Sequence, residues 1–386
     1  MSFLKQLLNE VEVQWKPLGE VLIRTKGTKI TAGQMRELHK TGAPVKIFAG
    51  GKTVAFVDFG DIPEKNVNLE PSIIVKSRGV IEFEYYDKPF SHKNEMWSYH
   101  TGDKAVDVKY AYHFLKLYEP HFQNIGSKMQ MPQIATPDTD QFEIPIPCPD
   151  NPRKSLEIHA EIVRILDAFT ELTAELTAEL TARKSQYNYY RDQLLKFEER
   201  DVEWKTLGDL AENLDSMRKP ITSGLRESGD IPYYGASGIV DYVKDYIFDC
   251  DLLLVSEDGA NLLARNTPIA FSISGKSWVN NHAHVLKFET YAERRYVEYY
   301  LNSIDLTPYI SGAAQPKLNK KNLESISIPD RSPEEKKRIV AFLDKFDALT
   351  NSITDGLPRE IALRQKQYEY YRDQLLSFSK PVAVEA

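Results

Sequence analysis

Apolar positions recur at intervals of three and four residues through the middle of the chain. This spacing places them on one face of a helix, and the stretch from about 155 to 197 contains neither glycine nor proline. We therefore predict one continuous helix here, which would span roughly 65 Å. Its apolar positions are Ile158, Ile162, Ile165, Leu166, Phe169, Leu172, Leu176 and Leu180.

A second helix is predicted near the C-terminus. Ser332 offers an N-cap, Pro333 suits the first helical position, and two glutamates follow at the positive end of the helix. The segment 355–358, DGLP, should break the helix, which should then resume and end near Phe378. Its apolar positions before the break are Ile339, Phe342, Leu343, Phe346, Leu349 and Ile353.

The central stretch contains a four-residue repeat, TELTAELTAELTA, at 170–182. Four residues turn a helix by about 400°, so each added unit returns near the same face and adds roughly 6 Å. We interpret the repeat as a spacer whose length can change in steps without altering the packed face.

The chain contains two copies of one sequence unit. VQWKPLG at 13–19 matches VEWKTLG at 202–208, and RKSQYNYYRDQLLKF at 183–197 matches RQKQYEYYRDQLLSF at 364–378 in 11 of 15 positions. A self-repeat of this kind predicts two equivalent structural units.

The repeat is nearly circular, because Gln6, Leu7 and Leu8 before Trp15 resemble 193–195 before Trp204. We therefore expect a pseudo-two-fold α/β protein in which two long helices pack antiparallel, like a coiled coil. The intervening parts, roughly 34–130 and 225–314, agree least, so the helices should present two dissimilar globular parts. The predicted divisions are a first globular domain (1–154), a central helix (155–197), a second globular domain (198–331), a C-terminal helix (332–379) and a tail (380–386).

Composition places the chain among ordinary soluble proteins, with 42% hydrophobic and 27% charged residues over 386 positions. No apolar run reaches the ~18 residues of a membrane span, and the N-terminus lacks a signal-peptide pattern. Cys148 and Cys250 are far apart and favour neither a disulfide framework nor a metal site. We expect a cytoplasmic protein.

The net charge of −7 is unlike that of a simple nucleic-acid binder. Its distribution is uneven, since 24–52 holds seven basic residues and one acid, whereas 201–330 holds 13 basic and 19 acidic residues. A second half that binds nucleic acid must therefore do so through a local basic patch.

Motifs for catalysis are absent or incomplete. Gly50-Gly51-Lys52-Thr53 resembles the end of a phosphate loop, but Lys46 occupies the position of the required first glycine. His282 and His284 have no third metal ligand in an evident pattern. No serine nucleophile elbow and no motif for adenine methylation is present. We expect a chain without catalytic, metal or cofactor sites of its own.

Basic and polar residues in glycine-rich turns are candidates for DNA contacts, because lysine and arginine suit phosphates, and asparagine and arginine suit base edges. Ordinary solvated turns are the alternative for each of them. In the first globular part the candidates are Lys26, Lys29, Arg36, Lys46 and Lys93. In the second they are Arg218, Lys219, Arg226, Tyr234, Ser237, Asn261, Arg265, Lys276, Asn280, Asn281, His282, Lys317 and Lys320.

Tyrosines concentrate at the two matching helix ends and admit two interpretations. They can be core residues of the helix pair, or they can dock another protein, since aromatic residues are enriched at interfaces. The candidates for docking are Tyr187, Tyr190, Arg191, Tyr368, Tyr371 and Arg372.

Taken together, these motifs resemble the specificity subunits of Type I restriction–modification enzymes. The resemblance covers essentially the whole chain. It rests on the duplicated WKxLG and QYxYYRDQLL segments, the TAEL spacer of one subgroup, and YYGASG, VSEDGANL and WVNNHAHVL at 233–238, 255–262 and 278–286.

The resemblance implies two α/β target-recognition domains, each recognising one half of a bipartite, asymmetric double-stranded DNA target, with the helices setting the gap. It also implies partners: two methyltransferase subunits and restriction subunits with translocase activity. S-adenosylmethionine, ATP and magnesium would belong to those partners. Two alternatives stay open, namely a coiled-coil scaffold that binds no DNA and an enzyme that acts on DNA alone.

Overall fold

The computed structural model describes residues 11–101, 106–128, 130–197, 202–312, 315–352 and 354–380. The predicted N-terminal echo at 6–8 and the tail beyond 380 lie outside these residues. The chain forms two compact units: unit 1 is Met1–Glu175 with Ile361–Ala386, and unit 2 is Leu176–Glu360. Each unit thus combines one globular part with portions of both long helices.

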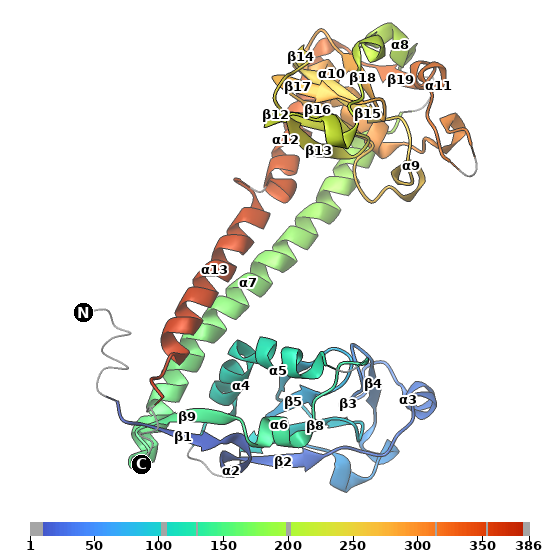
Figure 1. Ribbon diagram of the computed structural model, residues 1–386. Coiled ribbons are helices and arrows are strands. Elements are labelled where there is room, and N and C mark those ends of the chain that lie inside the picture. Colours follow the sequence, from blue (N-terminus) through green and yellow to red (C-terminus); the bar gives the residue numbers. More distant parts are fainter. Residues whose placement is uncertain are drawn as a thin grey trace. The chain divides into compact units, whose positions relative to one another are not determined.

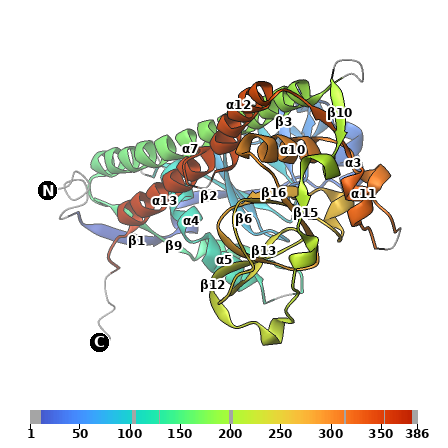
Figure 2. The same cartoon turned by 90° about the horizontal axis from the view of Figure 1, so that it is seen from above.

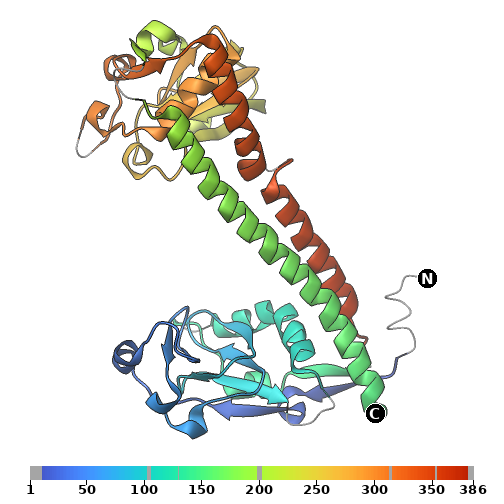
Figure 3. The ribbon, with the colours of Figure 1, turned by 180° about the vertical axis from the view of Figure 1, so that it is seen from behind.

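The predicted helices are present (Figures 1 and 3). α7 (Pro152–Leu195) runs for 44 residues. α12 (Pro333–Asn351) starts at the predicted cap, where the Ser332 side chain accepts a hydrogen bond from the Glu335 amide. The helix breaks earlier than predicted, because α12 already ends at Asn351, and α13 (Leu357–Leu376) begins inside the predicted segment 355–358. Glycine is required in this turn, since a Cβ on Gly356 would lie 2.4 Å from the carbonyl oxygen of Ala348.

The two helices pack against each other within each unit. In unit 2, Tyr187 contacts Phe346 and Tyr190 contacts Phe342, so the contacts run in opposite directions along the two helices. This order confirms antiparallel packing there. In unit 1, the Phe169 ring stacks on Tyr371 of α13.

The globular part of unit 1 is built on two antiparallel-rich sheets covered by helices. The strand order is β2-β8-β5-β6 in the larger sheet and β4-β3-β7 in the smaller one. The strands are β2 (Leu22–Lys26), β3 (Val45–Phe48), β4 (Val54–Val57), β5 (Ser72–Lys76), β6 (Glu82–Tyr86), β7 (Phe90–His92) and β8 (Trp97–Thr101). The helices are α2 (Leu18–Val21), α3 (Ala32–Leu38), α4 (Val108–Leu117), α5 (Glu119–Gly126) and α6 (Thr136–Asp140).

Unit 2 repeats this plan with two four-stranded sheets, ordered β11-β18-β15-β16 and β13-β12-β17-β14. Figure 2 shows α10 beside α12, in agreement with their close contact. The strands are β11 (Glu212–Asn213), β12 (Ser228–Gly235), β13 (Gly238–Val243), β14 (Phe248–Asp249), β15 (Leu252–Ser256), β16 (Ala270–Ile273), β17 (Lys276–Val279) and β18 (Ala283–Lys287). The helices are α8 (Leu207–Leu210), α9 (Asn261–Ala264), α10 (Tyr291–Ser303) and α11 (Lys320–Glu324).

A two-stranded ribbon joins each globular part to its long helix. β1 (Val13–Pro17) pairs with β9 (Glu143–Pro147), and β10 (Glu203–Thr206) pairs with β19 (Ser327–Asp330). Trp15 lies opposite Pro145 and Trp204 opposite Pro329, so the two registers are equivalent. Each of the two duplicated WKxLG segments therefore supplies one strand of such a ribbon.

In each globular part, one helix is bonded to the strand ribbon and to a long helix at matching positions. The hydroxyl of Tyr110 on α4 donates to the Pro145 carbonyl at 2.8 Å, and that of Tyr296 on α10 donates to the Pro329 carbonyl at 3.0 Å. Lys109 pairs with Asp167 of α7, and Arg295 pairs with Asp344 of α12. These contacts couple the orientation of each globular part to its helix.

Each unit has its own hydrophobic core. The core of unit 1 continues from its larger sheet onto Ile158, Ile162 and Leu166 of α7, and that of unit 2 onto Ile339, Val340 and Leu343 of α12. Within the described parts of the chain, no helix is both long and apolar enough to traverse a lipid bilayer.

Candidate DNA interface

Each globular part contains two loops that an isolated β-bridge joins, and we call them the loop pair. The residues of the loop pair differ between the two parts. In unit 1, Arg78 follows the central strand β5 and bridges to Gln133, just before α6. In unit 2, Asp258 follows the central strand β15 and bridges to Lys317, just before α11. The next residue is a glycine in both cases, with φ +80° at Gly79 and +101° at Gly259. Only glycine adopts this left-handed region readily, so the turn is kept while its neighbour changes.

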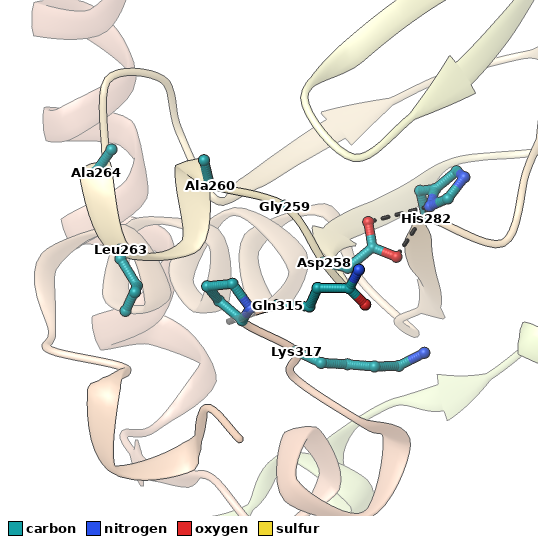
Figure 4. A pocket seen from close by; sticks show the side chains of 9 residues that line it. Asp258, Gly259, Ala260, Leu263, Ala264, His282, Gln315 and Lys317 are labelled. Carbon is teal, nitrogen blue, oxygen red and sulfur yellow. Dashed lines mark hydrogen bonds and ion pairs between the residues drawn. The ribbon is translucent and has the colours of Figure 1, made fainter. Parts of the chain in front are cut away.

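In unit 2 the loop pair borders a hollow of about 880 Å³ (Figure 4). His282 lies at its edge, and its Nδ1 is 2.9 and 3.0 Å from the two carboxylate oxygens of Asp258. A carboxylate accepts only, so Nδ1 must carry a proton and donate. Gln315 and Lys317 line the same hollow and are exposed.

Beneath this hollow lies a part-buried ion network. Arg218 pairs with Glu257 at 2.6 Å, Lys317 pairs with Glu257 at 2.9 Å, and the Nδ1 of His284 lies 2.6 Å from Asp215. Burial alone would raise the pKa of Glu257, but the hydrogen bonds from Arg218 and Lys317 outweigh it and lower that pKa. The network ties strand β18 and the basic loop at 317 to the central strand.

Asp215, Glu257 and His284 stand close enough to hold a cation in principle. Arg218 lies 3.5 Å from Asp215 and 2.6 Å from Glu257, so a basic group already neutralises each carboxylate. A divalent ion would have to compete with fixed cations, and we assign the cluster a structural role. His282 and His284 each have their own carboxylate, as expected of histidines that do not share a metal.

Four of the five unit 1 candidates are exposed or lie near the surface. Lys26, Lys29 and Arg36 are exposed and form no ion pair within the described part of the chain. Lys26 lines a hollow of about 360 Å³ together with Arg24 and Asn94. Lys93 pairs with Glu95 at 2.6 Å. The fifth, Lys46, is mostly buried, pairs with Glu84 and lies over the Phe48 ring, which favours a structural role.

The unit 2 candidates divide into exposed and internal sets. The exposed ones are Lys219, Ser237, Lys276, Asn281, His282, Lys317 and Lys320. The internal ones hold the fold, and these are Arg218, Arg226, Tyr234, Asn261, Arg265 and Asn280. Sequence patterns did not separate them, because some partners of the internal set lie far away in the sequence, up to 65 residues for Arg218.

The segment that resembles a phosphate loop is the turn between β3 and β4, an ordinary antiparallel hairpin. Gly51 has φ +66° there, which accounts for the glycine pair without any phosphate.

The tyrosine-rich helix ends contain both packed and exposed rings. Tyr187 packs on the core of unit 2, while Tyr368 and Tyr371 pack on the core of unit 1. Arg191 and Arg372 have matching environments, each bonded to the following aspartate and lying 5.8 Å from a tyrosine ring. The most exposed rings among the described residues of these ends are Tyr189 and Tyr370, at 62% and 61%, while Tyr190 is 37% exposed. A docking partner would meet these two first, and they were not among the numbered docking candidates.

Comparison with known proteins agrees with this duplicated architecture. Residues 10–183 and 199–363 match the family described as Type I restriction modification DNA specificity domain. The chain is 37% identical to the specificity subunit of the Type I restriction enzyme EcoR124I/EcoR124II of Escherichia coli, over 100% of this chain and 99% of that one. It is 34% identical to the EcoprrI specificity subunit of Escherichia coli, over 92% of each.

The fold is also that of a solved Type I restriction–modification S subunit from M. genitalium. That structure superimposes with a TM-score of 0.66 at 16% identity and covers 96% of this chain and 98% of its own. The duplicated α/β domains on paired helices define a class of modular DNA-specificity proteins without a catalytic centre of their own. The chain belongs to the Type I restriction–modification specificity subunit family.

Proposed function

We propose that this chain selects the DNA target of a Type I restriction–modification complex. Each globular part would recognise one half of a bipartite target, and the paired helices would set the gap between the halves. The observation that carries this proposal is the loop pair at Arg78–Gln133 and Asp258–Lys317, where one architecture displays different polar side chains. Different side chains at equivalent positions predict different half-sites, and therefore an asymmetric target.

Affinity for the DNA backbone would come from the exposed lysines and arginines, with Lys26, Lys29 and Arg36 in unit 1 and Lys219, Lys276 and Lys320 in unit 2. The chain carries a net charge of −7, so the partner subunits would supply further positive surface.

The partners would be two methyltransferase subunits and restriction subunits that translocate and cut DNA, in the cytoplasm. We propose that they dock at the helix ends around Tyr189 and Tyr370, where an exposed ring stands beside a packed one. S-adenosylmethionine, ATP and magnesium would be bound by the partners and not by this chain.

The test is to express the chain with its methyltransferase partner and to map methylated adenines across the genome. A split asymmetric motif with a constant gap supports the proposal. An assembled complex without any motif would refute it and favour an assembly scaffold that binds no DNA.

A further inference from the structure

The two copies of the loop pair share their backbone bridges and differ in the chemistry of their side chains. Arg78 and Asp258 occupy the same position after the central strand, and each forms an antiparallel bridge to the chain before the short helix. The backbone bonds below the bridge also match: the Ile134 amide donates to the Ser77 carbonyl, and the Leu318 amide donates to the Glu257 carbonyl. The position is therefore held firmly in both units, whatever side chain it bears.

In unit 1 this position offers two exposed hydrogen-bonding groups side by side. The Nε of Arg78 contacts the Met131 sulfur at 3.1 Å, and its two terminal nitrogens make no hydrogen bond to any described residue. The Gln133 amide group likewise has no side-chain bond within the described residues, while its backbone is fixed by the bridge. A guanidinium matches the two acceptors of guanine, and a glutamine amide matches the acceptor and donor of adenine.

In unit 2 the equivalent position carries different side chains. Asp258 holds the Nδ1 of His282, and the Nε2 of that ring makes no hydrogen bond to any described residue. Gln315 is exposed beside it (Figure 4). Lys317 is held by Glu257, which leaves His282 and Gln315 as the groups available to a ligand in the hollow.

The chemistry of both sets suits bases better than phosphates. A phosphate site gathers cations, whereas these sets contain two neutral amides and a carboxylate that would repel a phosphate. Amides without internal side-chain bonds and an imidazole held by Asp258 are groups that can discriminate donor and acceptor patterns in the major groove.

We propose that Arg78 and Gln133 in unit 1, and His282 and Gln315 in unit 2, determine specificity by contacting base edges of the two half-sites, with Asp258 as a positioning residue for His282. This inference rests on the proposed function and names the residues that carry it out. The unit 1 half-site should contain a guanine opposite Arg78 and an adenine opposite Gln133.

The experiment uses the full chain assembled with its methyltransferase partner, and the readout is the methylated motif together with the affinity for oligonucleotides that vary at single positions. Arg78→Ala, Gln133→Ala, His282→Ala and Gln315→Ala should each relax one base position in one half-site, with roughly tenfold or greater loss of discrimination there. The other half-site should stay unchanged. Arg153→Ala and Lys287→Ala, at exposed positions outside the loop pairs, are controls that should leave both half-sites intact.

Conservative variants separate base contacts from other roles. Arg78→Lys keeps the charge but loses the planar fork, so it should relax the same base as Arg78→Ala; an unchanged motif would mean that Arg78 contacts only a phosphate and would overturn its assignment. Asp258→Ala should relax the same base as His282→Ala, and Asp258→Asn should restore it, because an amide oxygen still accepts from Nδ1.

The outcomes distinguish the two proposals. A wild-type motif that survives all four alanine substitutions refutes this inference and leaves the proposed function standing. The absence of any motif for the assembled wild-type complex refutes the proposed function itself. Should an alanine variant fail to assemble, Arg78→Lys, Gln133→Glu and His282→Gln decide the question at the same positions.

Discussion

The ring of Phe169 on α7 stacks on Tyr371 of α13, with centroids 5.2 Å apart and planes 21° apart. Phe346 on α12 lies against Tyr190 of α7, with centroids 6.0 Å apart and the planes tilted by 41°. Phe169 corresponds to Phe346 and Tyr190 to Tyr371 in the sequence repeat. One aromatic joint is therefore built twice, and in each copy the phenylalanine comes from one helix and the tyrosine from the other.

Removing one ring of this joint should destabilise its own unit. Phe169→Ala should cost unit 1 about 1–2 kcal/mol of unfolding free energy, since a half-buried aromatic pair is lost. Phe346→Ala should do the same to unit 2. Hydrogen exchange resolved along the chain measures each effect, and Tyr189→Ala, at an exposed ring, is the control. Equal loosening of both units by either substitution would contradict the idea of two separate joints.

We predict that Asp344 holds α10 against α12. Its carboxylate accepts from Arg295 at 3.0 Å and from Tyr299 at 2.7 Å. Asp344→Ala leaves these part-buried donors with fewer acceptors, and should cost about 1–3 kcal/mol. Faster hydrogen exchange in α10, with α4 unaffected, is the expected result, and Asp344→Asn should recover part of the loss. Unchanged exchange in α10 would show that Asp347 and Glu298 suffice for Arg295.

Lowering the pH should reduce the folding stability of unit 1 before that of unit 2. Burial lowers the pKa of His159 to about 3, and its ring stacks on Tyr110 without a hydrogen-bond partner among the described residues. Burial likewise lowers the pKa of His92 to about 4. The folded state therefore binds fewer protons than the unfolded state, so the stability is complete above pH ~6.5 and falls as the pH drops toward these values, by about 1.4 kcal/mol per pH unit for each histidine.

Unit 2 has a lysine in place of that histidine. Lys336, which corresponds to His159, is buried and pairs with Asp330 at 2.7 Å and Glu293 at 2.9 Å. Burial would raise the pKa of Asp330, but Lys205 and Lys336 outweigh it and lower that pKa below 3.8, so this pair weakens only at lower pH. Urea unfolding followed by hydrogen exchange between pH 7 and 4.5 tests the order of loss. His159→Phe should flatten the response of unit 1, and an unaltered slope would exclude His159 as its source.

Lys26 and Arg218, which were both candidates for DNA contacts, should respond differently to substitution by alanine. Lys26 is exposed without an ion pair in the described chain, so Lys26→Ala should weaken DNA binding for all sequences and reduce the salt slope by about one unit. Arg218 bonds Glu257 and the Ala283 carbonyl, so Arg218→Ala should instead lower the stability of unit 2 by about 1–3 kcal/mol. Salt-dependent binding and thermal unfolding separate the two, and a reduced slope for Arg218→Ala would return it to the DNA contacts.

Deleting one TAEL unit, 177–180, should shorten the gap between the half-sites by one or two base pairs, because four helical residues span roughly 6 Å and a base pair ~3.4 Å. Both half-sites should stay unchanged, since the leucines at the four-residue interval keep their face. A changed half-site in the methylation map would refute the spacer role.

Local sequence patterns and the comparison of the chain with itself predicted much of the fold and the family. Apolar spacing and the Ser332 cap were enough to predict α7, α12 and the break before α13, because helices are specified by neighbours three and four residues apart. The match between Trp15 and Trp204 was enough to predict equivalent strands, and the duplication as a whole pointed to the family. These features depend on residues that are close in sequence or that can be compared with each other directly.

Tertiary structure alone decided which polar residues hold the fold and which stay exposed. Arg218 and Lys26 were both candidates for DNA contacts, but only folding brings Glu257 and Ala283 to Arg218, from 39 and 65 residues away. The equivalence of Arg78 with Asp258 was also hidden, because the repeat is weakest there and the match lies in backbone bridges to Gln133 and Lys317. Long-range pairing leaves no periodicity in the sequence, and so the positions that distinguish the two halves emerge only when the strands are in place.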